Sequence, residues 1–268
     1  MAKTALCIGI NDYPGTNADL SGCVNDVNDW KAVLGQKGFN VTTLLDRDAT
    51  KNNMAEAITK LFRDAGSGDT VVLQYSGHGS FVADLDGDEP DGRDEVLCPS
   101  DIGSNSYITD DELYEMFALA KAGAKIIFLS DSCHSGSVSK LRPVDGAAAG
   151  DRVTKSRFLP PGMFLRDFEI PDVAVAATSR RRKRRSKANK ALLISGCMDS
   201  QTSADAWFGG RPNGAFSYYA LRAFKEMPEG ANYGQWHAKI RDYLPNVYYG
   251  QAPNLMASNT QMKWKIFE

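Results

Sequence analysis

The fold is decided by two stretches of sequence, TVVLQYSGHG at residues 70–79 and KIIFLSDSCHSG at residues 125–136. Each stretch begins with a run of apolar and β-branched residues and ends in small residues. Such a run, bounded by a turn of small residues, is typical of a strand buried in a parallel sheet. In open α/β sheets the ligand crevice lies at the carboxyl ends of the strands. We therefore expect the residues that follow both runs to meet at one crevice.

A histidine and a cysteine follow these two runs. His78 and Cys133, delivered to one crevice, make a candidate base and nucleophile, so the pattern predicts a cysteine peptidase. A buried structural role is the commoner fate of a cysteine, but Cys133 stands in a turn rich in Gly and Ser, where exposure is easy. The chain has three histidines. His134 would point away from its neighbour Cys133, and His237 falls in a helical pattern. We therefore assign the base to His78.

Composition is that of an ordinary soluble globular protein. The 268 residues, 43% of them hydrophobic, are enough for one large α/β domain. The apolar run at residues 5–10 is too short for a signal peptide, and no stretch approaches the roughly 18 apolar residues of a membrane span. The five cysteines are scattered and form no CxxC pair. They predict reduced thiols in a cytoplasmic protein, not a disulfide framework or a zinc site.

The order of the expected elements indicates a single sheet. Strands are predicted at about residues 4–10, 39–45, 70–75, 125–130 and 191–196, with a closing strand at 263–267. Helices are predicted from a Ser21 cap to about residue 36 and at 51–65, 109–121, 215–224 and 233–244. This alternation predicts an α/β fold with a mainly parallel sheet and helices on both faces. We expect one domain over 1–268, in which a flexible loop at 139–190 separates a larger part (1–138) from a smaller one (191–268).

Five short motifs, taken together, resemble the metacaspases, and most of all their short prokaryotic members, the orthocaspases. The motifs are CVND (23–26), SGHG (76–79), DEPDGRDE (88–95), DSCHSG (131–136) and SGC with QTSAD (195–205). The resemblance spans roughly residues 4–267. The cysteine follows the histidine by 55 residues, near the roughly 50 of caspase-type peptidases. The resemblance implies the caspase–haemoglobinase fold and cleavage after Arg or Lys.

The resemblance also implies roles for individual residues. The amides of Gly79 and Cys133 would form an oxyanion hole. A specificity pocket would be lined by Cys23, Asp26, Ser76 and Asp131. Asp131 lies two residues before the nucleophile, which in an extended segment places both on the same side. Without the resemblance, Asp26 is better explained as a first-turn helix residue favoured by the helix dipole, and Asp131 is equally well a salt-bridged residue at a strand end.

The acidic loop at residues 84–95 is a candidate calcium site because of its many carboxylates. Its carboxylates match a calcium-loop spacing superficially, but Glu89 stands where an EF-hand needs glycine, so we do not expect an EF-hand. Many metacaspases bind calcium elsewhere, through a cluster that Asp94, Asp110 and Asp111 match in part. Lys140 replaces the remaining carboxylate, and its charge would repel the cation. We expect no required cofactor and weak or absent calcium dependence.

Residues 180–190 form a basic run that carries eight of the 31 basic residues, although the net charge is only −2. A solvated charge block, a nucleic-acid or nuclear-localisation patch, and a self-processing loop are the three hypotheses. A peptidase that prefers basic residues favours self-cleavage, with nucleic-acid binding second and a pseudo-peptidase scaffold as a further alternative. We expect a monomer that acts on peptides or proteins and has no membrane partner. The candidate cleavage residues are Arg180, Arg181, Arg182, Lys183, Arg184, Arg185, Lys187 and Lys190.

Overall fold

A six-stranded sheet forms the centre of the computed structural model, which describes residues 1–85, 87, 89, 91–104, 106–134, 154–165, 190–198 and 201–268. The strand order is β12-β9-β7-β3-β1-β2. All neighbours pair in parallel except β12, which is antiparallel to β9. The bounds are β1 Lys3–Gly9, β2 Asn40–Leu45, β3 Thr70–Ser76, β7 Lys125–Asp131, β9 Ala191–Ser195 and β12 Asn254–Met256.

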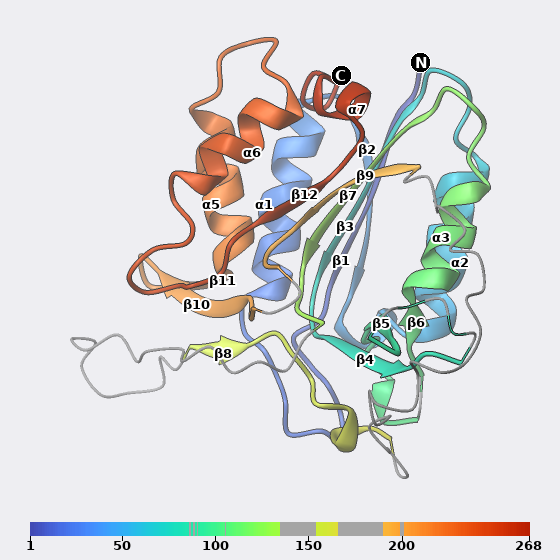
Figure 1. The fold of residues 1–268 in the computed structure, drawn as a ribbon, viewed down its shortest axis with the longest axis vertical. Coiled ribbons are helices and arrows are strands. Elements are labelled where there is room, and N and C mark those ends of the chain that lie inside the picture. The colour runs from blue at the N-terminus through green and yellow to red at the C-terminus, as the bar shows by residue number, and fades with distance from the viewer. Residues whose placement is uncertain are drawn as a thin grey trace.

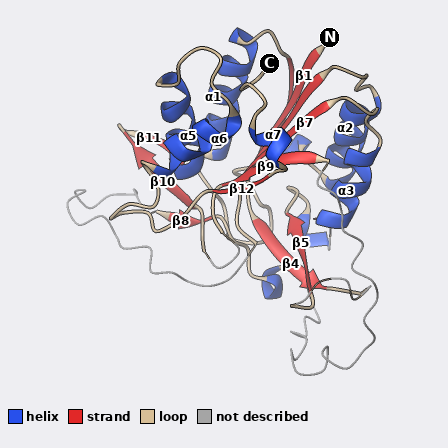
Figure 2. Ribbon diagram, turned by 45° about the horizontal axis from the view of Figure 1, so that its top comes forward, coloured by secondary structure: helices blue, strands red, loops and turns tan. Residues whose placement is uncertain are grey.

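Helices cover both faces of this sheet (Figures 1 and 2). One face carries α1 (Cys23–Gln36), α5 (Ala215–Lys225) and α6 (Tyr233–Arg241), and the other carries α2 (Lys51–Arg63) and α3 (Asp110–Ala118). The alternation along β1 explains the two cores, because Leu6 and Ile8 point into one and Ala5 and Cys7 into the other. The predicted α/β class, with a mainly parallel sheet and helices on both faces, is confirmed.

Two small antiparallel sheets lie near the carboxyl ends of the central strands (Figure 1). The first joins β4 (Gly79–Ala83), β5 (Arg93–Leu97) and β6 (Ile108–Thr109), and β4 and β5 are antiparallel neighbours. The second joins β8 (Lys155–Ser156), β10 (Ala204–Phe208) and β11 (Arg211–Gly214). Short 3₁₀ turns lie at Asp46–Asp48, Ile102–Ser104 and Pro161–Met163. The β8 strand and the last turn fall within 139–190, where the sequence shows no periodicity.

Two predicted elements differ from the structure. The closing strand at residues 263–267 is wrong: β12 completes the sheet, α7 (Asn259–Met262) follows it, and the buried Phe267 packs in the core with Trp30 and Trp236. The apolar residues at 263–267 anchor the end of the chain in the core and do not form a strand. The helix α1 has Gly22 as its N-cap and not the predicted Ser21, and no side chain caps it. The Ser21 amide, one residue earlier, donates to Asp205.

Candidate active site

The two central strands end level with each other. Ser76, the last residue of β3, is paired with Asp131, the last residue of β7, so His78 and Cys133 each lie two residues beyond the same edge. The backbones beyond that edge are in contact, because a Cβ on Gly79 would overlap the carbonyl oxygen of Cys133. Parallel pairing has therefore brought the predicted nucleophile and base to one crevice.

His78 is held by its own backbone. Its amide donates to Tyr13 Oη at 2.8 Å, and its carbonyl accepts from Tyr75 Oη at 2.6 Å. The rings of Tyr13 and His78 lie 4.7 Å apart, centroid to centroid. Tyr13 was not predicted as a site residue, and one sequence offers no signal for its role because the contact spans 65 residues of chain.

The protonation state of the imidazole follows from its contacts. Nε2 lies 2.6 Å from the carbonyl oxygen of Ala18, and since a carbonyl only accepts, Nε2 carries the hydrogen of the neutral ring. Nδ1 has no hydrogen-bond partner among the described residues. Burial lowers the pKa of His78 to about 4, and the backbone carbonyls of Ala18 and Arg157 oppose this shift. At neutral pH the ring is uncharged, and Nδ1 is its free base.

Cys133 is buried among backbone and sulfur atoms. Its Sγ accepts from the Ser203 amide, lies 3.7 Å from the Ser203 carbonyl oxygen, and is 3.6 Å from Cys197 Sγ. The contact with Cys133 raises the pKa of the Cys197 thiol. Within the described residues no hydrogen bond joins Cys133 Sγ to His78. Catalytic hydrogen bonds often tighten only when substrate is bound, so the dyad stays a prediction.

The two amides predicted for the oxyanion hole converge on one oxygen. Gly79 N donates to the carbonyl oxygen of Arg157 at 2.9 Å, and Cys133 N donates to the same atom at 3.3 Å. Two backbone donors aimed at one carbonyl oxygen beside a cysteine are the geometry that stabilises an oxyanion during acyl transfer. The chain itself supplies the carbonyl.

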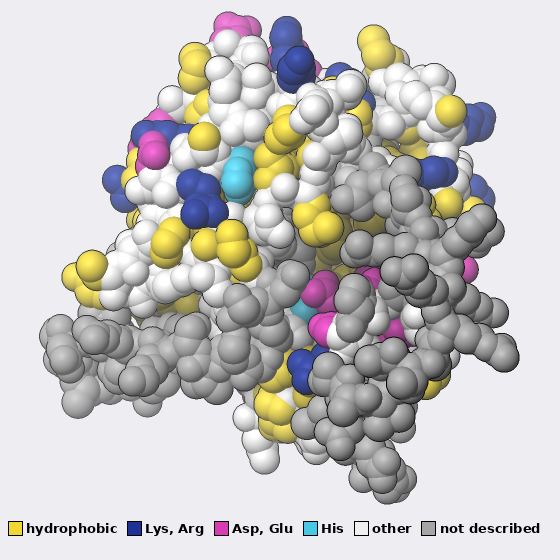
Figure 3. Space-filling view, viewed as in Figure 1, with side chains coloured by type: hydrophobic (Ala, Val, Ile, Leu, Met, Phe, Trp, Pro, Cys, Tyr) yellow, Lys and Arg dark blue, Asp and Glu magenta, His cyan; other side chains and the backbone are white. Residues whose placement is uncertain are grey.

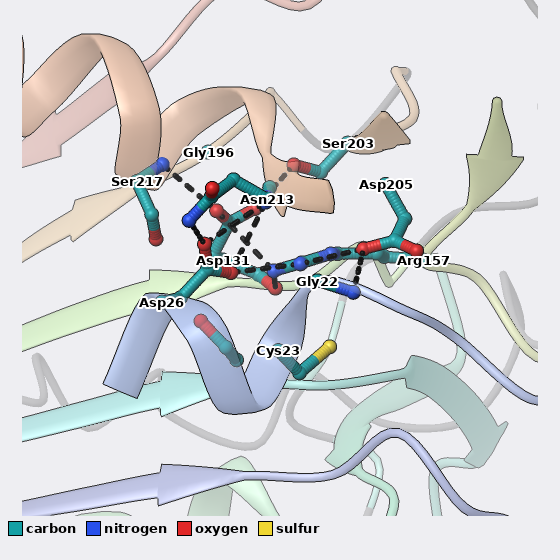
Figure 4. Close-up of polar contacts among 12 residues, drawn as sticks. Gly22, Cys23, Asp26, Asp131, Arg157, Gly196, Ser203, Asp205, Asn213 and Ser217 are labelled. Carbon is teal, nitrogen blue, oxygen red and sulfur yellow. Dashed lines mark hydrogen bonds and ion pairs between the residues drawn. The ribbon is translucent and has the colours of Figure 1, made fainter. Parts of the chain in front are cut away.

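The side chain of Arg157 fills the predicted specificity pocket, where three carboxylates surround its guanidinium (Figure 4). Nη2 lies 2.8 Å from Asp26 Oδ2 and 2.9 Å from Asp205 Oδ1, and Nη1 lies 3.3 Å from Asp131 Oδ2. The Arg157 side chain and those of Asp26 and Asp131 are completely buried. A buried cation is stable only when it is paired in this way.

Each carboxylate is also fixed by other donors. Burial raises the pKa of Asp26, and the Arg157 guanidinium opposes the rise. The outer donors are Asn213 Nδ2 and Gly214 N to Asp26, Ser203 Oγ and Ser217 N to Asp131, and Ser21 N and Gly22 N to Asp205. The three carboxylates are therefore held in place around the guanidinium by donors from other parts of the chain. Sequence reasoning missed Asp205, although it ends the QTSAD motif that contributed to the resemblance.

The other predicted pocket residues lie beside this cluster. Cys23 begins α1 and is buried, and burial raises its pKa while Arg157 opposes the rise. Ser76 is buried next to Asp131 in the sheet, but its hydroxyl accepts from Gln74 Nε2 at 2.8 Å. Both residues border the pocket without a hydrogen bond to Arg157 among the contacts of the described residues.

The remaining histidines have local partners. His134 Nε2 lies 3.4 Å from Ser132 Oγ. His237, on α6, lies with Nε2 2.9 Å from the carbonyl oxygen of Pro253. Neither contact involves Cys133.

The predicted calcium residues are on the small sheet and the helix after it. Asp94 lies on β5, and Asp110 and Asp111 begin α3. In the described parts of the chain, no group of three or more His, Cys, Asp or Glu side chains is placed to hold a metal ion. Calcium dependence stays a prediction.

Most of the predicted self-cleavage residues cannot be placed. Residues 180–189 lie outside the described residues, and Lys190 donates to the carbonyl oxygen of Ala118 at 3.2 Å. Among the helices that are described, none has the length and hydropathy required to span a bilayer.

Fold and site together define a caspase-like α/β protein with a cysteine and a histidine at neighbouring strand ends. The caspase-domain family matches residues 2–264, and the chain belongs to that family. It is 33% identical to Metacaspase-1 of Cryptococcus neoformans and 33% identical to Metacaspase-1 of Mycosarcoma maydis, covering 96% of this chain in both cases. It spans 62% of the first relative and 70% of the second.

Two solved structures are similar to this chain over almost its whole length. A crystal structure of a Geobacter sulfurreducens protein matches with a TM-score of 0.73 and 31% identity, over 100% of this chain and 98% of that one. Caspase-1 of Spodoptera frugiperda matches with a TM-score of 0.60 and 12% identity, over 96% and 86%, which shows a shared fold. The predicted resemblance to the metacaspases is confirmed.

Proposed function

We propose that the chain is a cysteine endopeptidase in which Cys133 is the nucleophile and His78 the base, and that it cleaves after Arg or Lys. The observation that supports this most strongly is the position of Arg157. Its carbonyl oxygen accepts from two amides, one of them that of Cys133, while its guanidinium lies among three carboxylates. A peptide bound with its basic residue in this pocket would present its carbonyl beside the nucleophile.

The mechanism uses groups already in place. Nδ1 of His78 takes the thiol proton of Cys133, and the thiolate attacks the carbonyl carbon of the bound residue. The Gly79 and Cys133 amides stabilise the oxyanion, and the carbon–nitrogen bond breaks as the histidine returns the proton to the leaving amine. Water, deprotonated by the same ring, hydrolyses the thioester and restores the thiol.

The pocket geometry favours arginine over lysine. Its carboxylates contact both Nη1 and Nη2, which matches the planar fork of a guanidinium. A lysine ammonium is a single compact charge and would leave one carboxylate without a direct partner. An aspartate in the same place would add a fourth negative charge to a buried cluster, so we expect no cleavage after Asp.

A panel of fluorogenic peptides tests the proposal. The peptides differ only in the residue before the scissile bond, which is Arg, Lys or Asp, and each is assayed with calcium and with a chelator. We expect kcat/KM to be highest for Arg, roughly 10-fold lower for Lys, and undetectable for Asp. Because Lys140 is expected to repel calcium, the chelator should change the rates little. Cleavage after Asp would contradict the pocket assignment.

The alternative of a nucleic-acid-binding protein depends on residues 180–190, of which the structure describes only Lys190. On the face drawn in Figure 3, the described basic side chains are scattered among apolar and acidic ones. A pseudo-peptidase scaffold would not require the histidine and the cysteine that this chain retains. We also propose a monomer in the cytoplasm, consistent with five free and buried cysteines.

A further inference from the structure

The geometry points to the Arg157–Phe158 peptide bond as a self-cleavage site, held in the chain's own active site in the orientation of a substrate. This inference rests on the proposed function and adds the bond, the direction in which the segment binds, and its consequence for access to the pocket. It differs from the expectation that self-cleavage falls in residues 180–190.

The segment before the bond is bound as a strand. β8 pairs antiparallel with β10, with Ser156 opposite Ala204 and Lys155 opposite Asp205. Arg157 N continues this ladder by donating to the carbonyl oxygen of Ser203 at 3.0 Å. Backbone pairing to a sheet edge is how an extended peptide is aligned for recognition independently of its sequence.

The residue at the bond satisfies three requirements of a substrate at once. Its carbonyl oxygen is bound by Gly79 N and Cys133 N, its guanidinium is buried among three carboxylates, and its amide is in the ladder. A structural salt bridge alone would need only the second of these. The coincidence of all three at Arg157 indicates a bond presented for cleavage.

The segment after the bond is held separately. Leu159 N donates to the carbonyl oxygen of Gly79 at 2.9 Å, and its own carbonyl oxygen accepts from Ser80 Oγ at 2.6 Å. Leu159 is fully buried in the core, and Phe158 stacks on Phe81 with centroids 6.0 Å apart. Both sides of the bond are fixed in the folded chain. The entropy cost of ordering a flexible substrate in the active site has therefore already been met by folding.

Two consequences follow. Before cleavage, Arg157 excludes other substrates from the pocket, so the intact chain is a latent enzyme. After cleavage, the new amino terminus at Phe158 stays anchored by Leu159, whereas Arg157 becomes a carboxyl terminus attached only on its own side. Arg157 can then move out of the pocket, so that the basic side chain of a substrate can bind there.

The chemical step is the one proposed above, applied within the chain. Cys133 Sγ forms a bond to the carbonyl carbon of Arg157, and the bond from that carbon to Phe158 N breaks. The thiol proton passes through His78 to the Phe158 amine. Water then replaces the sulfur, which leaves the Arg157 carboxylate and a free thiol.

The test follows freshly purified full-length protein by intact mass and by sequencing of new termini. Wild type should yield residues 1–157 and 158–268, and Cys133→Ala should remain intact. Arg157→Gln should be cut at this bond at least about 100-fold more slowly. The matched control, Lys155→Gln, changes a basic residue of the same segment whose Nζ contacts only the carbonyl oxygen of Asp19 in the described structure, and it should be cut as wild type.

A second variant and a binding measurement keep the test decisive if Arg157→Gln folds poorly. Arg157→Lys retains a cation for the buried carboxylates and should be cut at the same bond, but more slowly. In the Cys133→Ala background, a fluorescent peptide ending in Arg should bind at least about 10-fold more tightly once Arg157→Gln or Arg157→Lys weakens occupancy of the pocket.

The outcomes separate the two proposals. Wild type that cleaves added Arg peptides while its own Arg157–Phe158 bond stays intact would overturn this inference and leave the proposed function standing. Cleavage confined to residues 180–190 would do the same. Protein that cleaves neither peptides nor itself would overturn the proposed function, and equal peptide binding with and without Arg157 would show that the pocket is open.

Discussion

The contacts of His78 hold its ring in one protonation state. The Ala18 carbonyl fixes the hydrogen on Nε2, burial keeps the ring neutral, and Tyr13 and Tyr75 hold its backbone. A neutral histidine with a free Nδ1 is the form that a general base requires. The two flanking glycines are there for close packing: a Cβ on Gly77 would lie 2.5 Å from Tyr75 Oη and 2.6 Å from Tyr13 Oη.

The lowered pKa of His78 predicts a pH dependence of stability. Its pKa falls from 6.5 to about 4 on folding, so between these values the unfolded chain binds a proton that the folded chain does not. The free energy of unfolding should therefore fall as pH drops through this window, by up to about 1.4 kcal/mol per pH unit. Urea unfolding of Cys133→Ala from pH 7.5 to 4 measures it. Cys133→Ala/His78→Gln is the control, and an identical slope in both would contradict the prediction.

Asp205 is the pocket carboxylate that the sequence did not reveal. With Asp26 and Asp131 it contacts the guanidinium of Arg157. Removing one charge from a buried, hydrogen-bonded cluster costs about 2 kcal/mol or more, so Asp205→Asn should lower kcat/KM for Arg peptides roughly 30-fold or more. Asp64→Asn is the matched control, since Asp64 pairs with Lys60 at an exposed site at the end of α2, away from the pocket. Equal effects of the two substitutions would show that the pocket does not bind the cation.

The junction between β11 and α5 closes one side of the pocket. Gly214 caps α5 with φ −69° and ψ 137°, a conformation open to alanine, but its Cβ would lie 2.6 Å from Arg157 Nη1 and would overlap an Asp131 oxygen. Gly214→Ala should therefore lower kcat/KM for Arg peptides about 10-fold or more without backbone strain. Gly35→Ala, on α1 with no atom within 4 Å of the added carbon, should have no effect on the rate. Full activity in Gly214→Ala would mean that the guanidinium binds elsewhere.

The elements that the sequence predicted are those with strong periodicity. Apolar spacing in the sequence reflects which face of an element is buried. It therefore predicted the buried strands β3 and β7 and the amphipathic helix α2. Short strands such as β8 and β10 have no such pattern in the sequence, because they are defined by pairing with distant segments of the chain and not by local residue spacing. Arg157 was missed for the same reason: nothing local distinguishes it from the other basic residues.

The site was predictable where one strand end carries the signal. The positions of His78, Cys133 and Asp131 follow directly from two runs and their turns, whereas the roles of Gly79 and Asp26 needed the resemblance. The partners that fix them, such as Tyr13 and Asp205, come from distant parts of the chain. Only the folded structure brings those together.

Cleavage at Arg157–Phe158 would not separate the whole molecule into parts. β9 and β12, from the second half, continue the sheet beside β7, and Trp236 and Phe267 pack against Trp30 from the first half. A core shared this extensively holds two chains together. Cleaved protein should have the mass of the full chain plus one water under native conditions and give two fragments only in denaturant. Separation of the fragments in native buffer would contradict this picture.

In the proposed mechanism Cys133, aided by His78, attacks the carbonyl after a bound arginine. This step is tested most directly by covalent labelling with a peptidyl-arginine chloromethyl ketone in chains that all carry Arg157→Gln, so that the pocket is open in each of them. The adduct is located by mass spectrometry in this parent chain and in its His78→Ala, His134→Ala and His237→Ala variants. We expect an adduct on Cys133, formed at least about 100-fold more slowly in His78→Ala and at nearly the parent rate in the other two variants. A peptidyl-aspartate analogue should not react. An adduct on Cys197, whose Sγ lies 3.6 Å away, or equal labelling by the aspartate analogue, would contradict it.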